Sequence, residues 1–216
     1  MSSEYPEPTS VDERQSVRKR RAILAAAATV FLQKGYLGTS MDEVAALASV
    51  SKQTVYKHFS DKERLFGEVV AAMVDEVSDP VHEVVLHLDE SGDIEAGLHD
   101  LARRQLAMVM QPRLLRLRRL VIGESARFPE LGRTFYERGP ERTIDALASV
   151  LEQLARRGSL EIDDPRLAAA HFNWLVMSIP LNQAMLQGSD EPASPEELDH
   201  YADAGVRAFM RAYTRR

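Results

Sequence analysis

The chain has 216 residues, of which 44% are hydrophobic, and a formal net charge of −6. This length suffices for one large or two small domains with a buried core. The absence of cysteine excludes a disulfide framework and thiolate chemistry. The longest apolar run, residues 22–32, is too short to span a membrane, and the acidic N-terminal residues do not form a secretory signal. We therefore expect a soluble, cytoplasmic protein.

The charge is distributed unevenly along the chain. Residues 14–66 carry 10 Lys/Arg and 4 Asp/Glu, whereas residues 67–216 carry 17 Lys/Arg and 25 Asp/Glu. A basic region next to an acidic one is attracted to phosphates at one end and repelled at the other. The negative total is therefore compatible with a nucleic-acid contact made by residues 14–66.

Residues 1–17 are predicted to form a disordered tail because residues 1–13 are polar and contain two prolines. Basic residues then open the first helix at positions 18–21, where they oppose the helix dipole, so a phosphate contact explains Arg18 and Arg21 better than local stability. An ordinary solvated basic turn is the alternative. Leu24, Ala27, Ala28 and Phe31 have the spacing of an amphipathic helix, which Gly35 is expected to end.

Three helix starts follow within residues 39–66. Ser40 with Glu43 and Ser60 with Glu63 fit capping boxes, and Ser51 fits a further N-cap. These caps predict helices over residues 41–48 and 52–58 and a third helix from Asp61. Two short helices joined by a tight turn are typical of a helix-turn-helix, whose second helix can enter the major groove of DNA.

The helix over residues 52–58 has one apolar face, formed by Val55 and Phe59. Gln53 and Lys57 point the other way, where Gln can pair with adenine and Lys with guanine. Hydroxyl, imidazole and ammonium groups on its flanks suit phosphates. A solvated surface helix is the alternative. The predicted DNA-contacting residues are Arg18, Arg21, Thr39, Ser40, Ser51, Lys52, Gln53, Thr54, Tyr56, Lys57, His58 and Lys62.

Residues 18–66 resemble the DNA-binding domain of the TetR family of transcriptional regulators. The resemblance implies an all-helical homodimer without a catalytic function, in which a divergent C-terminal domain binds a small effector. Ser49 differs from the glycine that the family usually has in the turn, and serine tolerates a left-handed backbone less well. The matching residues are Ile23, Ala27, Phe31, Gly35, Thr39, Ser40, Val44, Ala45, Val50, Ser51, Thr54, Tyr56, Phe59, Lys62, Glu63, Leu65 and Phe66.

The remaining chain is predicted to be helical throughout. The helix from Asp61 is expected to kink or break at Pro80, and Ser91-Gly92 indicates a loop. Residues 112–160, including the Phe-Pro-Glu-Leu run at 128–131, resemble the C-terminal domain of an AcrR/AefR-like branch. The fold class is therefore all-α, with a helix-turn-helix domain over 18–66 and an effector-binding and dimerisation domain over 67–216. Further helices are predicted over residues 95–110, 113–127, 130–137, 141–157, 165–187 and 195–213, with a break at Gly139-Pro140.

The helices over 141–157 and 165–187 carry apolar side chains on more than one face, which indicates a core side and a partner side. Two such helices from each subunit could form a four-helix dimer interface, although a large monomer core is the alternative. The predicted interface residues are Ile144, Leu147, Leu151, Leu154, Leu167, His171, Phe172, Leu175 and Ile179.

An effector pocket is predicted in the same region because methionine adapts to irregular space and a few polar groups among apolar ones suit a ligand. Plain core packing is the alternative for each residue. Arg113, Arg116, Arg118 and Arg119 could face an anionic ligand, but a solvated helix face is the favoured interpretation. The predicted pocket residues are Met108, Phe128, Phe135, Tyr136, Asn173, Trp174, Met177 and Met185.

Metal and enzyme functions are disfavoured. The six histidines are scattered, His82 and His87 lack the spacing of a helical metal pair, and no phosphate-binding or nucleophile motif occurs. We expect no metal, no cofactor and no catalytic residue.

The sequence predicts a repressor that binds a palindromic or near-palindromic operator and is released by an apolar or aromatic effector, through displacement of the long helix from Asp61. The alternatives are a helical enzyme or carrier with a basic end, and a regulator that acts through a protein partner without a ligand.

Overall fold

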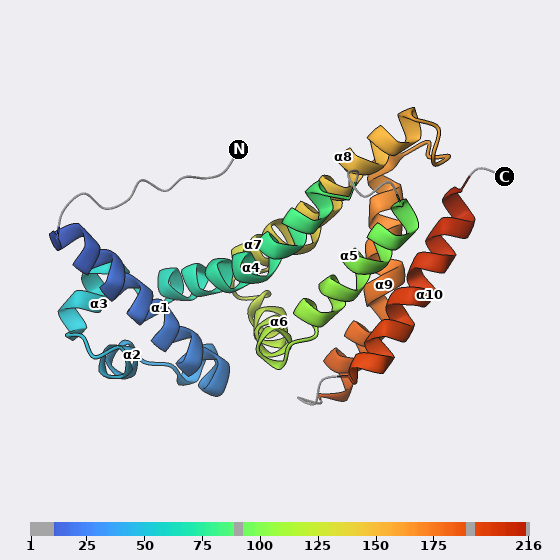
Figure 1. Ribbon diagram of the computed structural model, residues 1–216. Coiled ribbons are helices and arrows are strands. Elements are labelled where there is room, and N and C mark those ends of the chain that lie inside the picture. The colour runs from blue at the N-terminus through green and yellow to red at the C-terminus, as the bar shows by residue number, and fades with distance from the viewer. Residues whose placement is uncertain (1–10, 89–92, 189–192, 215–216) are drawn as a thin grey trace. The chain divides into compact units, whose positions relative to one another are not determined.

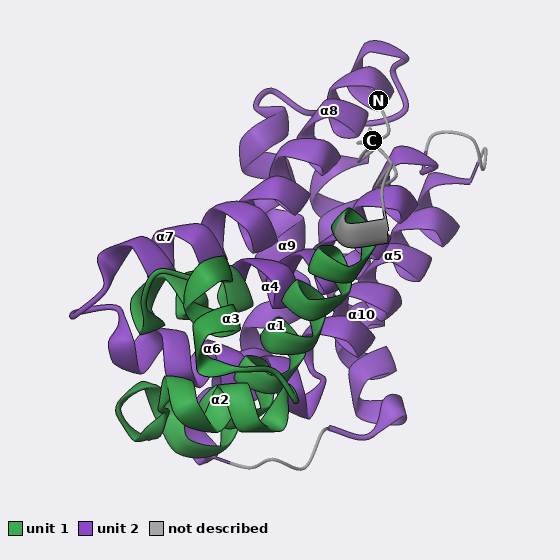
Figure 2. Ribbon diagram, turned by 90° about the vertical axis from the view of Figure 1, so that its left-hand side faces the viewer, with its two compact units in different colours: residues 1–70 green, residues 71–216 purple. Residues whose placement is uncertain are grey.

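The computed structural model describes residues 11–88, 93–188 and 193–214, which form helices and connecting turns without any strand (Figure 1). The chain divides into two compact units, which meet in sequence between Val70 and Ala71 (Figure 2). This division falls a few residues beyond the boundary at 66/67 that the sequence predicted. The helix α4, Lys62–Leu86, contributes residues to both units. The predicted loop at Ser91-Gly92 lies outside the described residues.

The first unit consists of α1 (Val11–Gly38), α2 (Met41–Leu47), α3 (Lys52–His58) and the start of α4. Helix α1 begins at Val11, so residues 11–17 are helical and the predicted disordered tail is wrong for this stretch. The regular part of α1 ends where Gly35 takes a φ of 71°, a backbone conformation that favours glycine. The helices α2 and α3 agree with the predicted ranges, and α3 does so at both ends.

An aromatic cluster closes the core of the first unit. The ring centroid of Phe66 lies 4.7 Å from that of Phe31 and 5.4 Å from that of Tyr36. Val55 and Phe59, the apolar face predicted for α3, are fully buried. The short α3 is therefore held by a few large side chains on one face.

The second unit contains the rest of α4 and six further α-helices among the described residues. Their bounds are α5 Ile94–Val109, α6 Pro112–Glu124, α7 Pro129–Tyr136, α8 Arg142–Arg156, α9 Pro165–Gln187 and α10 Pro195–Tyr213, with a π-helix, η1 Glu137–Glu141, between α7 and α8.

The breaks predicted at two prolines do not occur. Helix α4 continues past Pro80, because Val81 and Val85 on the following turns are buried in the core. Burial of these side chains outweighs the roughly 3 kcal/mol that an internal proline costs. The predicted break at Gly139-Pro140 is also wrong: a π-helix spans it, and such segments often occur at functional sites.

The core of the second unit is formed where α9 packs against α8 and α10, and α10 packs against α5. Phe172 and Phe209 meet edge to face with ring centroids 5.4 Å apart. A Cβ atom at Gly205 would lie 2.9 Å from the Val176 side chain, so α9 and α10 approach closely at this point. A buried hydrogen bond from Gln105 to Asn173, 2.8 Å long, joins α5 to α9.

The four interface residues predicted on α8 are not available to a partner, because this apolar stripe faces the core of its own chain. Ile144, Leu147, Leu151 and Leu154 are all at most 3% exposed, and Phe172 on α9 is equally buried. By contrast, α9 keeps a second, outward apolar face formed by Leu167, His171, Trp174, Leu175 and Ile179. The apolar stripe of α8 is thus covered, whereas α9 has an exposed apolar face, although the sequence patterns of the two helices are alike.

Candidate functional site

Local hydrogen bonds position the short helices of the first unit. The hydroxyls of Ser40 and Ser51 accept from the backbone N–H groups of Glu43 and Thr54, at 3.2 and 3.1 Å, so both predicted N-caps are confirmed. The predicted capping box of Ser40 with Glu43 is only half formed, because the Glu43 carboxylate pairs with Lys34 at 2.6 Å. The predicted capping box of Ser60 with Glu63 is wrong. Asp61 caps α4 instead, accepting from the N–H of Arg64 at 2.8 Å. This bond and the Ser60 hydroxyl lower the pKa of Asp61.

The turn between α2 and α3 contains a non-glycine residue in the left-handed region. Ser49 has a φ of 55°, and the N–H of Val50 donates to the Ala45 carbonyl at 3.1 Å. The turn therefore keeps the left-handed geometry despite serine, at some cost in backbone strain.

The outward face of α3 is available for contact. Gln53, Tyr56 and Lys57 are exposed, and no hydrogen bond or ion pair to another described residue engages their side chains. Arg18 and Arg21 on α1 are exposed as well. Polar and cationic groups without internal partners on a helix projecting from its supporting turn can reach base edges and phosphates.

Two residues of the predicted DNA-contacting set hold the first unit together. Thr39 is only 3% exposed, and its hydroxyl donates to the Gly35 carbonyl at 2.8 Å. The ammonium of Lys62 donates to the carbonyls of Tyr36 and Thr39, both at 2.9 Å, and lies 4.4 Å from the Tyr36 ring centroid. Lys62 thereby ties the start of α4 to the segment between α1 and α2.

Other predicted contact residues are partly engaged. Lys52 forms an ion pair with Asp42 at 2.7 Å, and that hydrogen bond raises the pKa of Lys52. Burial and the nearby charge of Arg20 lower the pKa of His58. Arg20, one of the basic residues at positions 18–21 but not among the predicted contacts, pairs with Glu68 at 2.7 Å and lies over the Phe59 ring.

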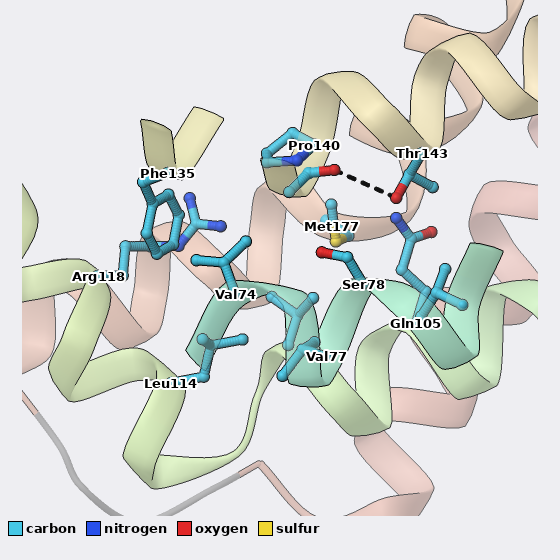
Figure 3. A pocket seen from close by; sticks show the side chains of 13 residues that line it. Val74, Val77, Ser78, Gln105, Leu114, Arg118, Phe135, Pro140, Thr143 and Met177 are labelled. Atoms are coloured by element: carbon cyan, nitrogen blue, oxygen red, sulfur yellow. Dashed lines mark hydrogen bonds between the residues drawn. The ribbon is translucent and has the colours of Figure 1, made fainter. Parts of the chain in front are cut away.

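A pocket lies within the second unit, between α4, α5, α6, α9 and the α7–η1–α8 segment (Figure 3). Its cavity volume is about 40 Å³, room for a few water molecules, and it opens to solvent. The lining is mainly apolar and contains no carboxylate. It is formed by Val74, Val77, Ser78, Val81, Gln105, Val109, Leu114, Arg118, Phe135, Gly139, Pro140, Thr143 and Met177.

Of the predicted pocket residues, Phe135 and Met177 line this pocket. Asn173 is buried behind it, bonded to Gln105. Met108 lines an adjoining hollow that shares Val77 and Leu114 with the pocket. The rest of the prediction is wrong for this pocket, because none of Phe128, Tyr136, Trp174 and Met185 lines it, and Tyr136 and Trp174 are exposed.

The long helix from Asp61 was expected to act on the effector site, but no residue of α4 and only Met108 of α5 were among the predicted pocket residues. Gln105 stands at an apolar position of α5, beside Leu101, Ala102 and Leu106, all fully buried. A polar side chain within such a stripe is a detectable signal for a buried polar site. Two α4 aspartates also face the π-helix region: Asp75 pairs with Arg138 at 2.6 Å, and Asp79 pairs with Arg142.

Arg118 places a cationic group at one end of the pocket. Its guanidinium carbon lies 4.9 Å from the Phe135 ring centroid, and burial lowers its pKa to about 10, so it stays charged at neutral pH. Figure 3 shows Arg118 beside Phe135, with Gln105 and Thr143 at the other side of the view. The pocket thus combines an apolar body with polar groups at its ends.

The described residues contain no cluster of side chains suited to a metal ion, and none of the described helices is long and apolar enough to cross a membrane. A short helix with a free polar face, held after a tight turn on a second short helix, defines the class of the protein: it is a helix-turn-helix DNA-binding protein.

Comparison with known proteins agrees with this class. Residues 23–69 match the profile of the bacterial regulatory proteins of the tetR family, and residues 96–215 match the C-terminal domain of AefR-like transcriptional repressors. The chain is 28% identical to the uncharacterized HTH-type transcriptional regulator YhgD of Bacillus subtilis, over 80% of this chain and 93% of YhgD.

Two solved structures extend the similarity to nearly the whole chain. A TetR-family regulator from Mesorhizobium loti MAFF303099 has 46% identity and a TM-score of 0.88, over 93% of this chain and 99% of that chain. The flavonoid-responsive regulator FrrA has 33% identity and a TM-score of 0.72, over the same shares. The chain belongs to the TetR family of transcriptional regulators and is a DNA-binding repressor, not an enzyme.

Proposed function

We propose that this protein binds a palindromic or near-palindromic operator as a homodimer, and that a small apolar or aromatic effector in the pocket releases it. The observation that carries the proposal is the lining of the pocket by α4, the helix whose first turn is tied into the first unit through Lys62. Release of the operator by an effector is typical of the family.

Base recognition is assigned to Gln53 and Lys57, which project from α3 without internal partners among the described residues. Phosphate contacts are assigned to Arg18, Arg21 and Tyr56, whose side chains are also exposed. Each bidentate base contact is worth about 1–3 kcal/mol of discrimination.

The dimer contact is assigned to the outward face of α9. Leu175 and Ile179 are 43% and 53% exposed, and Leu167 is 51% exposed on the same side. A continuous apolar face of this kind marks a protein contact. Two recognition helices in a dimer read half-sites about 34–36 Å apart, or a multiple of one DNA turn.

The effector would act through α4. Val74, Val77, Ser78 and Val81 of this helix line the pocket. A ligand that fits best when α4 is displaced therefore favours a state in which the DNA-binding units of the dimer have a different spacing. The coupling equals the difference in ligand affinity between the two states, about 1–3 kcal/mol in typical cases. The name of FrrA, a flavonoid-responsive relative, supports an aromatic effector.

The test of DNA binding is selection of bound sequences from a random pool, followed by titration of the selected operator. Gln53→Ala and Lys57→Ala should each relax the preference at particular base pairs. Gln33→Ala, an exposed residue of α1, is the matched control and should leave the profile unchanged. Identical profiles for wild type, Gln53→Ala and Lys57→Ala would remove the assignment of base contacts to α3.

The test of effector response uses reciprocity. A true effector weakens operator binding by the same factor by which operator weakens effector binding. Calorimetric titration with and without saturating operator measures this factor directly. A pocket ligand whose affinity is independent of operator would favour a regulator that acts without a ligand.

A further inference from the structure

The arginines of the second unit differ in their surroundings. Several exposed arginines form ion pairs: Arg138 with Asp75, Arg142 with Asp79, and Arg166 with both Glu141 and Asp145. Arg118, which reaches into the pocket, forms no ion pair with any described carboxylate, and its buried Nε has no hydrogen-bond partner. Arg118 is therefore a largely buried cation without a counter-ion among the described residues.

A buried charge without a counter-ion lowers stability, since it loses hydration and gains no attraction. The Phe135 ring at 4.9 Å offsets part of this cost through a cation–π contact, but it satisfies none of the guanidinium N–H donors. Replacement by an apolar residue would fill the same space more favourably. A bound anion would supply the counter-ion that Arg118 lacks.

The far side of the pocket also has an unpaired polar atom. Gln105 is 3% exposed, its Nε2 donates to Asn173, and its Oε1 has no partner. The hydroxyl of Thr143 nearby already donates to the Gly139 carbonyl at 3.3 Å. Between Arg118 and Gln105 the lining is mostly aliphatic, as Figure 3 shows for Val74, Val77 and Met177.

We infer that the pocket binds a hydrophobic organic acid, whose carboxylate pairs with Arg118 while its apolar body lies along α4 and reaches toward Gln105. This inference rests on the proposed role of the pocket as an effector site and adds the chemical class of the effector. Guanidinium pairs bidentately with a planar carboxylate, which satisfies two donors at once. A cationic ligand is disfavoured because no carboxylate lines the pocket.

The experiment uses pairs of ligands that differ only in charge: benzoic, naphthoic, biphenylcarboxylic and decanoic acids, each with its primary amide. Calorimetry on the full-length protein measures both affinities at neutral pH. At least one acid should bind about tenfold or more tightly than its amide, the gain expected of hydrogen bonds to a charged group. If no acid in the series binds better than its amide, the inference is overturned.

Variants of Arg118 test whether this residue causes the preference for the acid over the amide. Arg118→Met should abolish the advantage of the acid and leave amide binding within about twofold, and Arg118→Lys should keep part of the advantage. Arg116→Met removes an exposed charge from the same helix and should keep the full affinity advantage of the acid. Arg118→Met without ligand should also melt no lower than wild type. Retention of the acid preference in Arg118→Met would overturn the inference even if the protein bound acids well.

Operator titrations separate this inference from the proposed function. If acids bind through Arg118 but leave operator affinity unchanged, the recognition of acids stands and the effector role fails. If the amides release operator and the acids do not, the effector role stands and the inference fails.

Discussion

The two units of this protein are held together by interactions of different range. In the first unit, the caps of α2, α3 and α4 each join residues three positions apart. In the second, the hydrogen bond of Gln105 to Asn173 spans 68 positions, and that of Arg103 to Asp203 spans 100. The first unit is therefore specified mainly by local chemistry and the second by contacts that only the folded chain creates.

The largest expected effect concerns the second unit, where a charge introduced on α8 and one introduced on α9 should have different consequences. Leu151→Glu should unfold this unit, because a buried carboxylate without a partner costs several kcal/mol, roughly 4 or more. Ile179→Glu should stay cooperatively folded but sediment as a monomer and lose operator binding. Circular dichroism and sedimentation velocity distinguish the two outcomes.

Ala107→Glu, at an exposed site of α5, is the control and should remain dimeric. A wild-type protein that sediments as a monomer at micromolar concentration, or a dimeric Ile179→Glu variant, would contradict the assignment of the contact to α9.

The next effect tests how closely α9 and α10 must approach. Gly205→Ala should lower the free energy of unfolding by about 1–3 kcal/mol, since its Cβ would meet Val176 at 2.9 Å and overpack the contact. Gly123→Ala on α6 is the matched control, because a Cβ there meets nothing within 4 Å. It should instead stabilise by roughly 0.5–1 kcal/mol. Urea denaturation measures both, and equal effects would exclude the packing explanation.

In the first unit, Lys62 and Arg20 are exceptions to local control: the bonds of Lys62 to Tyr36 and Thr39 span 26 and 23 positions, and that of Arg20 to Glu68 spans 48. Lys62→Met should cost about 1–3 kcal/mol, the value of hydrogen bonds made by a charged donor. Arg64→Met removes a charge from an exposed side chain two residues later and should change stability little. If Lys62→Met retains full stability and weakens operator binding, the phosphate contact predicted from sequence is its main role.

A smaller, stabilising effect is expected at the turn before α3. Ser49→Gly should raise the free energy of unfolding by about 0.5–1 kcal/mol, because glycine adopts a φ of 55° without the strain that serine has. The gain is local, so operator specificity should stay unchanged. Thermal denaturation together with the selected operator profile checks both points. A destabilised Ser49→Gly protein would show that the serine side chain contributes more than its backbone costs.

The smallest effect is a pH dependence at His58, whose pKa is lowered first by burial and then by the charge of Arg20. Below the ordinary histidine pKa, the unfolded chain takes up a proton that the folded chain resists, so stability falls as pH drops through that value. His58→Gln should remove this part of the decline between about pH 7.5 and 5.5. His200→Gln, at an exposed site, is the control; an unchanged slope in His58→Gln would refute the assignment.

The sequence by itself determined the elements whose signals are local. Ser51 and the residues after it define α3 at both ends, and the prolines at positions 165 and 195 mark the starts of α9 and α10. Each signal acts through a hydrogen bond or a restricted dihedral within one turn of the chain, so it is readable from neighbouring residues. The helix-turn-helix and the all-α fold follow from such signals.

Only the tertiary structure decided which faces are covered. Apolar stripes on α8 and α9 looked equivalent, yet the residues packed around them bury Leu151 and leave Ile179 exposed. Likewise the sequence does not distinguish Arg118 from the other arginines of α6. Only the fold shows that Phe135 of α7 lies against its guanidinium group. The physical reason is that burial depends on a partner surface distant in sequence, and an apolar pattern states that a face must be covered without stating by what.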